Sequence, residues 1–526
     1  MMRHELLQQL DDFAQPWDMI VIGGGATGLG TAVDAAARGY RTLLLEQRDF
    51  AAGTSSRSTK LIHGGVRYLQ QGNLALVQES LHERGLLMRN APHLVHNLSF
   101  IVPLYEWWEG PFYGAGLKLY DLLAGRLGLG PSRHLSREET LRLLPMIEPT
   151  ALRGGISYYD GQFDDARLAI CLARTLEDLG GIPLNYCTVT AFEKSAGRII
   201  GVVVRDNESG REHRLQSRTV INATGVYCDA LRRLDDPAVD DIMTTSQGIH
   251  LVLERSFLGG NSAIMVPHTD DGRVLFAIPW HDRVLLGTTE TPVTSISLEP
   301  RPLEKEIDFL LEHAGRYLTS HPGRIDILSM FAGLRPLLRN KKHDDTASLS
   351  RDHVIMVSKS GLITIAGGKW TTYRRMAEDA VDQAESIAGL PPRASNTENL
   401  SLHGWEETLE NGAWSEYGAD SSRLIELAGK IPAGSELLHP RLPYRVCEVI
   451  WSVRHEYART VEDVLSRRTR ALLLDAAVSM EIAPRVALLM AAELGYDEAW
   501  QQRQVSDFLQ LAHGYLPGLP AQGAKR

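Results

Sequence analysis

Residues 54–69 bring together side chains that are suited to acid–base chemistry and to anion binding. The stretch begins with hydroxyl groups and continues through a histidine, His63, to an arginine, Arg67. Hydroxyls and backbone N–H groups can bond phosphate oxygens, a histidine can move a proton, and an arginine can fix an anion. Because the stretch is rich in Gly, Ser, Thr and Arg and shows little hydrophobic period, we expect a long loop over a site.

A βαβ unit directly before this loop is predicted to position it. Residues 18–22 form a short apolar run that is typical of a buried parallel strand. Residues 26–38 are rich in alanine and predict a helix, which Gly39 ends in the left-handed conformation. Residues 42–45 then predict a second strand, which ends at Glu46.

The turn between the first strand and the helix has the pattern G-x-G-x-x-G. Gly23 permits the tight turn, Gly25 lets a pyrophosphate approach the backbone, and Gly28 lets helix and strand pack closely. The helix N-terminus directs its N–H groups at the phosphate, and Glu46 can accept both hydroxyls of an adenosine ribose. A glycine-rich turn that binds nothing is the alternative, but it does not explain Glu46. The stretch therefore predicts a dinucleotide site.

Length and composition exclude several classes of protein. A chain of 526 residues exceeds one hydrophobic core, so we expect two or three domains. A net charge of −10 disfavours a general nucleic-acid binder. The four cysteines are scattered without metal-binding spacing, which predicts reduced thiols in a cytoplasmic protein and no metal site. We find no signal peptide, and no apolar run approaches the roughly 18 residues of a membrane span.

The run from Thr54 to Leu69, TSSRSTKLIHGGVRYL, resembles the flavin-contacting signature of the FAD-dependent glycerol-3-phosphate dehydrogenases. Residues 333–337 and 362–375 resemble two later signatures of that family. An apolar strand that ends in Ala223-Thr224-Gly225 resembles the second dinucleotide-facing strand of glutathione-reductase-like flavoproteins. The resemblance covers residues 17–390 strongly and the remaining C-terminal part in outline.

This resemblance implies FAD as the cofactor and an α/β fold with three parts. These are a discontinuous, glutathione-reductase-like FAD-binding Rossmann domain, an antiparallel β-rich substrate domain and a C-terminal helical domain. The predicted FAD contacts are Gly23, Gly25, Gly28, Glu46, Thr54, Ser55, Ser56, Lys60, Gly64, Gly65, Ala223, Gly225, Gly367, Gly368 and Thr371.

The domain boundaries follow from the pattern along the chain. Short alternating strands between residues 242 and 327 predict the substrate domain, and a Pro/Ser/Asn-rich linker precedes residue 402. We place the FAD-binding domain at 17–95, 151–235 and 328–390, an insertion at 96–150, the substrate domain at 240–327 and the helical domain at 402–526.

The resemblance names the reaction as the oxidation of glycerol 3-phosphate to dihydroxyacetone phosphate, with electrons passed to a membrane quinone. Hydride transfer from a secondary alcohol also needs a base for the hydroxyl proton. His63 is the first candidate, and His250, on an alternating strand, is the second candidate or a structural residue. The predicted substrate contacts are Arg67, Tyr68, Arg335 and Lys369, and the last two would also lie beside the flavin.

Two other functions stay open. An oxidase would keep the fold and use molecular oxygen as its acceptor. A non-catalytic flavoprotein would bind FAD for structure or redox sensing, although stability alone needs neither His63 nor Arg67.

An aromatic segment, residues 105–129, begins with six aromatic residues in sixteen positions and continues with leucines beside Lys118 and Arg126. This composition suits the membrane interface, so we expect peripheral association with the inner face of the cytoplasmic membrane. A buried core between domains is the alternative. A homodimer is a further possible state of the protein.

Two further interpretations concern polar residues in helices. Asp164 or Asp165 is predicted to cap a helix that begins there. The C-terminal part mixes acids with five arginines, and we interpret that mixture first as a solvated helical face rather than a binding patch. These residues are Arg454, Arg459, Arg467, Arg468 and Arg470.

Overall fold

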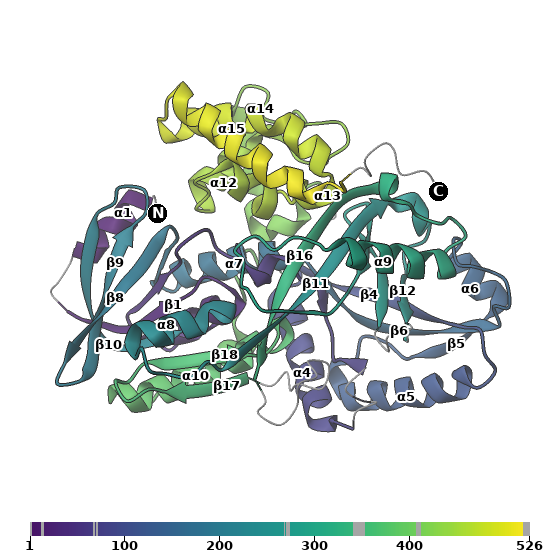
Figure 1. Ribbon diagram of the computed structural model, residues 1–526, viewed down its shortest axis with the longest axis horizontal. Coiled ribbons are helices and arrows are strands. Elements are labelled where there is room, and N and C mark those ends of the chain that lie inside the picture. Colours follow the sequence, from purple (N-terminus) through teal and green to yellow (C-terminus); the bar gives the residue numbers. More distant parts are fainter. Residues whose placement is uncertain are drawn as a thin grey trace.

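The computed structural model describes residues 3–11, 15–66, 69, 72–267, 269, 274–339, 353–406 and 412–518. Figure 1 shows two β-sheets side by side, with the C-terminal helices above the place where they meet. Arg67 and Tyr68, two predicted substrate contacts, lie outside the described residues.

The first sheet contains the predicted βαβ unit. Its main strands run in the order β17-β18-β10-β1-β2-β7, and all neighbours from β18 to β7 are parallel. Helix α2 (Ala26–Ala37) joins β1 to β2 and packs on α7 and α10. Gly39 follows it with φ +80°, as predicted. The remaining bounds are β1 (Trp17–Ile22), β2 (Thr42–Leu45), β7 (Ile182–Leu184), β8 (Cys187–Ser195), β9 (Arg198–Asp206), β10 (Glu212–Asn222), β17 (His353–Val357), β18 (Ile363–Gly367), α1 (Arg3–Gln8), α7 (Asp165–Asp178), α8 (Cys228–Asp235) and α10 (Tyr373–Ala388).

The second sheet is mostly antiparallel; it contains the strands of the predicted substrate domain, residues 240–327, together with strands from outside that range. Its strands run in the order β15-β11-β14-β13-β12-β4-β6-β3, with β16 added on β11 and β5 on β6. The bounds are β3 (Leu61–Ile62), β4 (Val95–Leu104), β5 (Arg133–Ser136), β6 (Gly154–Phe163), β11 (Met243–Glu254), β12 (Ala263–Val266), β13 (Leu275–Trp280), β14 (Arg283–Gly287), β15 (Thr291–Val293), β16 (Ile327–Leu338), α4 (Leu74–Asn90), α6 (Arg137–Leu143) and α9 (Glu304–Tyr317).

Each of the three predicted stretches of the FAD-binding domain contributes a strand to this second sheet instead: β3, β6 and β16. Strand β6 pairs with β4 along ten residues, and β16 pairs with β11 over almost its whole length. The predicted boundary at residue 151 therefore falls just before β6, and the one at residue 328 falls inside β16, and both strands belong to the other sheet. Pairing between strands about fifty or more residues apart decided this, and no local pattern carries that information.

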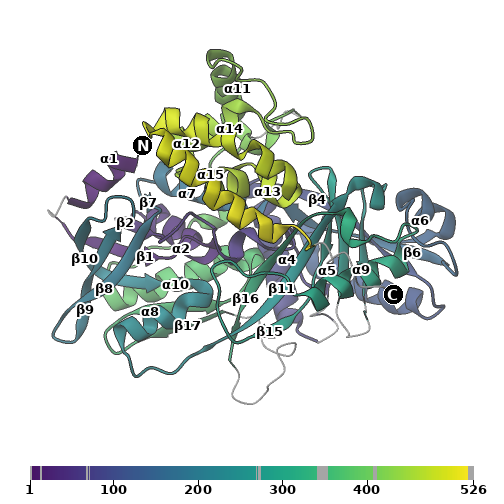
Figure 2. The same cartoon turned by 45° about the horizontal axis from the view of Figure 1, so that its top comes forward.

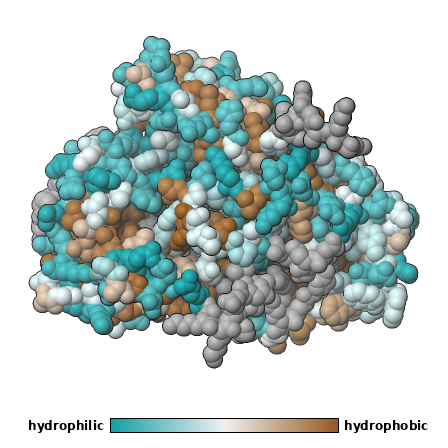
Figure 3. All heavy atoms as spheres, viewed as in Figure 1, coloured by the Kyte–Doolittle hydropathy of each residue, from teal (hydrophilic) through white to brown (hydrophobic). Residues whose placement is uncertain are grey.

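Helix α5 (Glu109–Ala124) carries most of the aromatic segment on the molecular surface. Tyr113, Leu117 and Tyr120 face inward and are buried, whereas Trp107 and Leu122 are 74% and 76% exposed. In Figure 3 hydrophobic side chains reach the surface along the lower edge, where α5 lies in Figure 1. The segment is therefore buried on one side only. None of the described helices has both the length and the apolar character that a membrane span requires.

The C-terminal part is helical, as predicted, and lies against both sheets (Figure 2). Its helices are α11 (Ser421–Lys430), α12 (Val446–His455), α13 (Ala471–Leu474), α14 (Ala476–Leu494) and α15 (Glu498–Ala512). The interpretation of its arginines as a solvated face is wrong for three of them, because Arg467, Arg468 and Arg470 are almost fully buried.

Candidate active site

A cavity of about 440 Å³ lies where the two sheets meet. One wall comes from the glycine-rich turn, the segment 45–55 and the segment 223–227. The other wall comes from strands β11 and β16 of the second sheet, and residues 367–371 after β18 close one end. These are the segments to which the sequence assigned the cofactor and the substrate.

The glycine-rich turn leaves space for a pyrophosphate. Gly23 has φ +116°, and a Cβ on Gly28 would lie 1.9 Å from the Gly23 carbonyl oxygen, so both glycines serve the turn and its packing. Gly25 lies at the N-terminus of α2 and lines the cavity. Ser55 Oγ accepts a hydrogen bond from the next backbone N–H, that of Ala26, at 2.9 Å. A helix N-terminus without a side chain at its first position suits a phosphate ligand.

Glu46 follows β2 directly and lines the cavity, where the sequence predicts a ribose-binding acid. Its Oε2 accepts a hydrogen bond from Gly24 N at 2.7 Å, and its Oε1 accepts one from Arg48 N at 2.8 Å. Burial raises the pKa of Glu46 above its ordinary value, although these two backbone donors oppose the rise. Each carboxylate oxygen has a second acceptor position, so the residue fits two ribose hydroxyls. The turn and Glu46 together fit FAD.

Arg335 and His250 lie on neighbouring strands of the second sheet. A Cβ on Gly248 would lie 2.3 Å from Arg335 Nη2, so the guanidinium occupies the space above this glycine. Nη2 also donates to Thr288 Oγ1 at 3.1 Å. Strand β11 thus provides the room for Arg335, and Thr288, directly after β14, provides a partner that orients it.

His250 is buried, and its ring is stacked on Phe331 with the centroids 5.0 Å apart. Its Nε2 shares a hydrogen bond of 2.9 Å with Thr59 Oγ1. Burial, and then the charges of Lys60 and Arg335, hold the pKa of His250 well below its usual range. The imidazole is therefore neutral at physiological pH.

His63 and Lys369 also line the cavity, together with Thr371. The backbone N–H of His63 donates to Thr371 Oγ1 at 3.3 Å, and Trp370 Nε1 donates to Ser55 O at 2.9 Å. These bonds join the 54–66 loop to the turn before α10, although more than 300 residues separate them.

Five predicted FAD contacts do not line the cavity: Gly28, Ser56, Lys60, Gly64 and Gly65. The prediction is wrong for the Lys60 side chain, which is completely buried and donates to Asp165 Oδ2 at 2.7 Å and to Ser56 O at 2.8 Å. Burial lowers the pKa of Lys60 to about 8, although Asp165 opposes this. Asp165, which is remote in the sequence, thus binds the Lys60 ammonium group at a place outside the cavity lining.

Two family comparisons cover most of the chain. The family described as FAD dependent oxidoreductase matches residues 18–374, and the C-terminal domain of alpha-glycerophosphate oxidase matches residues 359–501. Mouse mitochondrial glycerol-3-phosphate dehydrogenase is 40% identical over 538 residues, which cover 95% of this chain and 74% of the mouse protein. The human enzyme is 40% identical and covers 97% of this chain and 75% of its own. The chain belongs to the FAD-dependent glycerol-3-phosphate dehydrogenase family.

Solved structures share this fold. Glycerol-3-phosphate dehydrogenase from Bacillus halodurans, complexed with FAD, is 28% identical with a TM-score of 0.81, and the alignment covers 98% of both chains. The L-alpha-glycerophosphate oxidase of Mycoplasma pneumoniae, at 18% identity and a TM-score of 0.58, shares the fold over 73% of this chain. The predicted family, fold class and FAD cofactor are confirmed.

In this member of the glycerol-3-phosphate dehydrogenase family, sequence reasoning missed some of the cavity wall. Val189 lines the cavity from a segment without a motif, so nothing local could have identified it, whereas Tyr227 lies two residues after the recognised Ala223-Thr224-Gly225. Arg57 also lines it and carried a usable signal, because it lies inside the recognised loop. Its guanidinium donates to Glu299 Oε2 at 2.5 Å, and Tyr515 OH donates to the other oxygen of that carboxylate at 2.7 Å.

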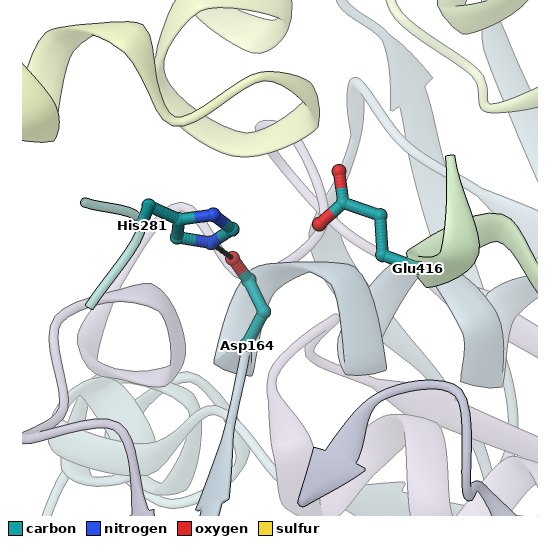
Figure 4. Close-up of side chains that lie close together, drawn as sticks. All are labelled: Asp164, His281 and Glu416. Carbon is teal, nitrogen blue, oxygen red and sulfur yellow. Dashed lines mark hydrogen bonds and ion pairs between the residues drawn. The ribbon is translucent and has the colours of Figure 1, made fainter. Parts of the chain in front are cut away.

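Asp164, His281 and Glu416 form a separate cluster, in which the ligand atoms lie within 4.8 Å of one another (Figure 4). Such a group has the composition of a metal site. However, Asp164 Oδ1 caps α7 by accepting from Arg167 N, which confirms the predicted cap. Its Oδ2 lies 3.3 Å from His281 Nε2 and 3.2 Å from Arg470 Nε. Arg470 and His281 already occupy this carboxylate, so we interpret the cluster as a polar junction between the segments and not as a metal site.

Proposed function

We propose that the protein oxidises the secondary hydroxyl of glycerol 3-phosphate to the ketone of dihydroxyacetone phosphate and passes the electrons to a membrane quinone. The observation that carries this proposal is a cavity that is lined both by a dinucleotide cradle and by Arg335, His250 and His63, in a member of this enzyme family. Bound FAD supplies the hydride acceptor. The residues of the chain then have to bind the substrate, orient it and take up the hydroxyl proton.

Arg335 is the residue that we assign to the substrate phosphate. A guanidinium offers two parallel N–H donors to a phosphate, and Thr288 holds one side of it in place. Lys369 lines the same cavity and adds a second cation. Together they suit a dianionic substrate better than neutral glycerol.

We assign proton removal to His63, which is half-buried and lines the cavity. His250 is neutral and can accept a hydrogen bond, but its depressed pKa makes it a weak base. Anaerobic mixing with glycerol 3-phosphate should bleach the flavin, and a quinone should then reoxidise it faster than air does. Reoxidation that is faster with air would favour an oxidase, and no bleaching would favour a non-catalytic flavoprotein.

Gly25→Val should abolish FAD retention. Gly25 has an extended backbone conformation, so valine causes no backbone strain there. However, the Cβ of the valine would lie 3.0 Å from Ser55 Oγ, and its methyl groups would fill the space of the pyrophosphate. The flavin-to-protein ratio of the purified variant checks this. Gly429→Val, on an open face of α11, is the matched control. A yellow Gly25→Val protein with one FAD per chain would contradict the assigned cradle.

Membrane attachment through α5 is part of the proposal. Trp108 and Phe112 are 45% and 54% exposed, and their neighbours Tyr113 and Leu117 fix the opposite face of the helix in the core. Since the net charge is −10, electrostatic attraction to anionic lipids contributes little. Contact of this apolar surface with the bilayer interface would place the protein beside its quinone acceptor.

Replacing Trp107, Trp108 and Phe112 together by serine should release the protein from liposomes, whereas high salt should release little of the unchanged protein. Flotation on a density gradient measures the bound fraction. Ile325→Ser, which changes a residue that is 86% exposed and lies outside α5, is the control. An unchanged bound fraction for the triple variant would contradict the attachment. If sedimentation without lipid showed a dimer that the triple variant loses, the surface would instead be an interface between two copies.

A further inference from the structure

The C-terminal helices contact the loops around the FAD cavity through three buried arginines. Arg467, Arg468 and Arg470 are 3%, 0% and 1% exposed. Charged side chains so deeply buried need partners of opposite charge. Arg467 and Arg468 bind Asp49, in the segment that lines the cavity around Glu46, and Arg470 binds Asp165 of α7 and the backbone of Ser56, whose neighbours Ser55 and Arg57 line the cavity.

An unusual backbone path directs these side chains. Residues Asp463–Arg468 form a π-helix, closed by a hydrogen bond from Thr469 N to Val464 O at 2.9 Å. Arg470 follows with φ +62°, a left-handed conformation that non-glycine residues seldom adopt. Isolated π-helical turns are rare and occur often at functional sites. Here the turn and Arg470 direct three side chains toward the first sheet.

Asp49 is the partner of two of the arginines. Arg468 binds it with both terminal nitrogens, at 2.6 Å to Oδ2 and 2.8 Å to Oδ1, and Arg467 Nε donates to Oδ2 at 2.5 Å. Burial alone would raise the pKa of Asp49, but Arg468 and Arg467 lower it to about 2. Asp49 does not line the cavity, whereas Glu46 and Ala51 on either side of it do. Arg467 and Arg468 therefore hold the segment around Glu46 through Asp49, on the side that faces away from the cavity.

Arg470 holds the next segment in the same way. Its Nη2 donates to Asp165 Oδ1 at 2.6 Å and to the backbone oxygen of Ser56 at 3.4 Å. Lys60 donates to the same backbone oxygen and to the other oxygen of Asp165. The neighbouring residues Ser55 and Arg57 line the cavity.

We infer that Arg467, Arg468 and Arg470 are positioning residues for FAD and that the C-terminal helical part is needed to retain the cofactor. Among the described residues, none after Thr371 lines the cavity, so this part acts through the 46–60 segment and not by contact. The inference rests on the assignment of the cavity to FAD. Without the anchor, the segment that carries Glu46 and Ser55 would lose its fixed position, and FAD would bind less tightly.

Asp49→Asn, which keeps the shape and removes the charge, tests this. Loss of charge-assisted hydrogen bonds should raise the Kd for FAD about ten- to hundredfold, measured by fluorescence titration of protein stripped of flavin. The control is Arg459→Gln, which breaks a surface ion pair between the C-terminal part and Glu208, away from the cavity. It should change the Kd by less than about threefold. An Asp49→Asn protein with unchanged FAD affinity would overturn the inference.

Hydrogen exchange on the unchanged protein gives a second test, which holds even if Asp49→Asn fails to fold. Because coupling between two sites is reciprocal, FAD added to stripped protein should slow exchange of the amides in residues 463–470. Unchanged exchange there, with FAD bound, would overturn the inference. Stripped unchanged protein that cannot rebind FAD would overturn the assignment of the cavity itself.

Discussion

Replacing His63 by alanine should slow flavin reduction by glycerol 3-phosphate by on the order of 10²–10⁴. The hydroxyl proton of the substrate has to leave as the hydride is transferred, and His63 lies on the cavity wall where a base is needed. Substrate affinity should change little, because the phosphate contacts remain. Anaerobic stopped-flow measurements of the absorbance of the oxidised flavin give this rate directly.

The pH dependence of reduction distinguishes His63 from His250. Because the pKa of His250 lies well below its usual range, that residue stays neutral across physiological pH and cannot produce a rise in rate near neutrality. If the rate of flavin reduction rises with pH in the unchanged protein, this rise should therefore be absent in His63→Ala. His82→Ala, on the exposed face of α4, is the control. Should His63→Ala reduce its flavin at the normal rate, His250 becomes the candidate base.

Replacing Arg335 by alanine should lower kcat/KM for glycerol 3-phosphate about ten- to hundredfold. The lost charge-assisted hydrogen bonds to the phosphate are worth about 1.5–3 kcal/mol. Glycerol, which has no phosphate, should react as slowly with the variant as with the unchanged protein. Steady-state assays with both substrates supply the comparison, and the difference between them isolates the phosphate contact.

A surface arginine gives the matched control for this variant. Arg324 forms ion pairs with Glu304 and Asp308 on the surface of helix α9. Arg324→Ala should therefore leave kcat/KM unchanged for both substrates. Arg335→Lys keeps the charge and loses the two parallel donors, and we expect it to be intermediate. If Arg335→Ala lowered kcat/KM equally for glycerol and for glycerol 3-phosphate, Arg335 would act at the flavin and not at the phosphate.

The local motifs of this protein were predictable because their physical causes are local. The βαβ unit, the left-handed Gly39 and the acid at the end of β2 depend on hydrophobic period, backbone freedom and spacing within about thirty residues. The recognised loop and the turn at residues 367–371 were assigned to one site, and the structure joins them at His63. Family resemblance, not spacing, supplied the substrate.

Tertiary structure alone decided which charged and apolar residues face water. Lys60 lies inside a recognised cofactor loop, yet Asp165, more than 100 residues later, binds it away from the cavity. The C-terminal arginines have the composition of a solvated face, but a π-helix and Asp49 bury two of them. The composition of the aromatic segment suited a membrane interface and a buried core equally well. In the structure one face of α5 is buried and the opposite face is exposed. A side chain's partners lie far away in the sequence, so its burial is fixed only when the sheets and helices have packed.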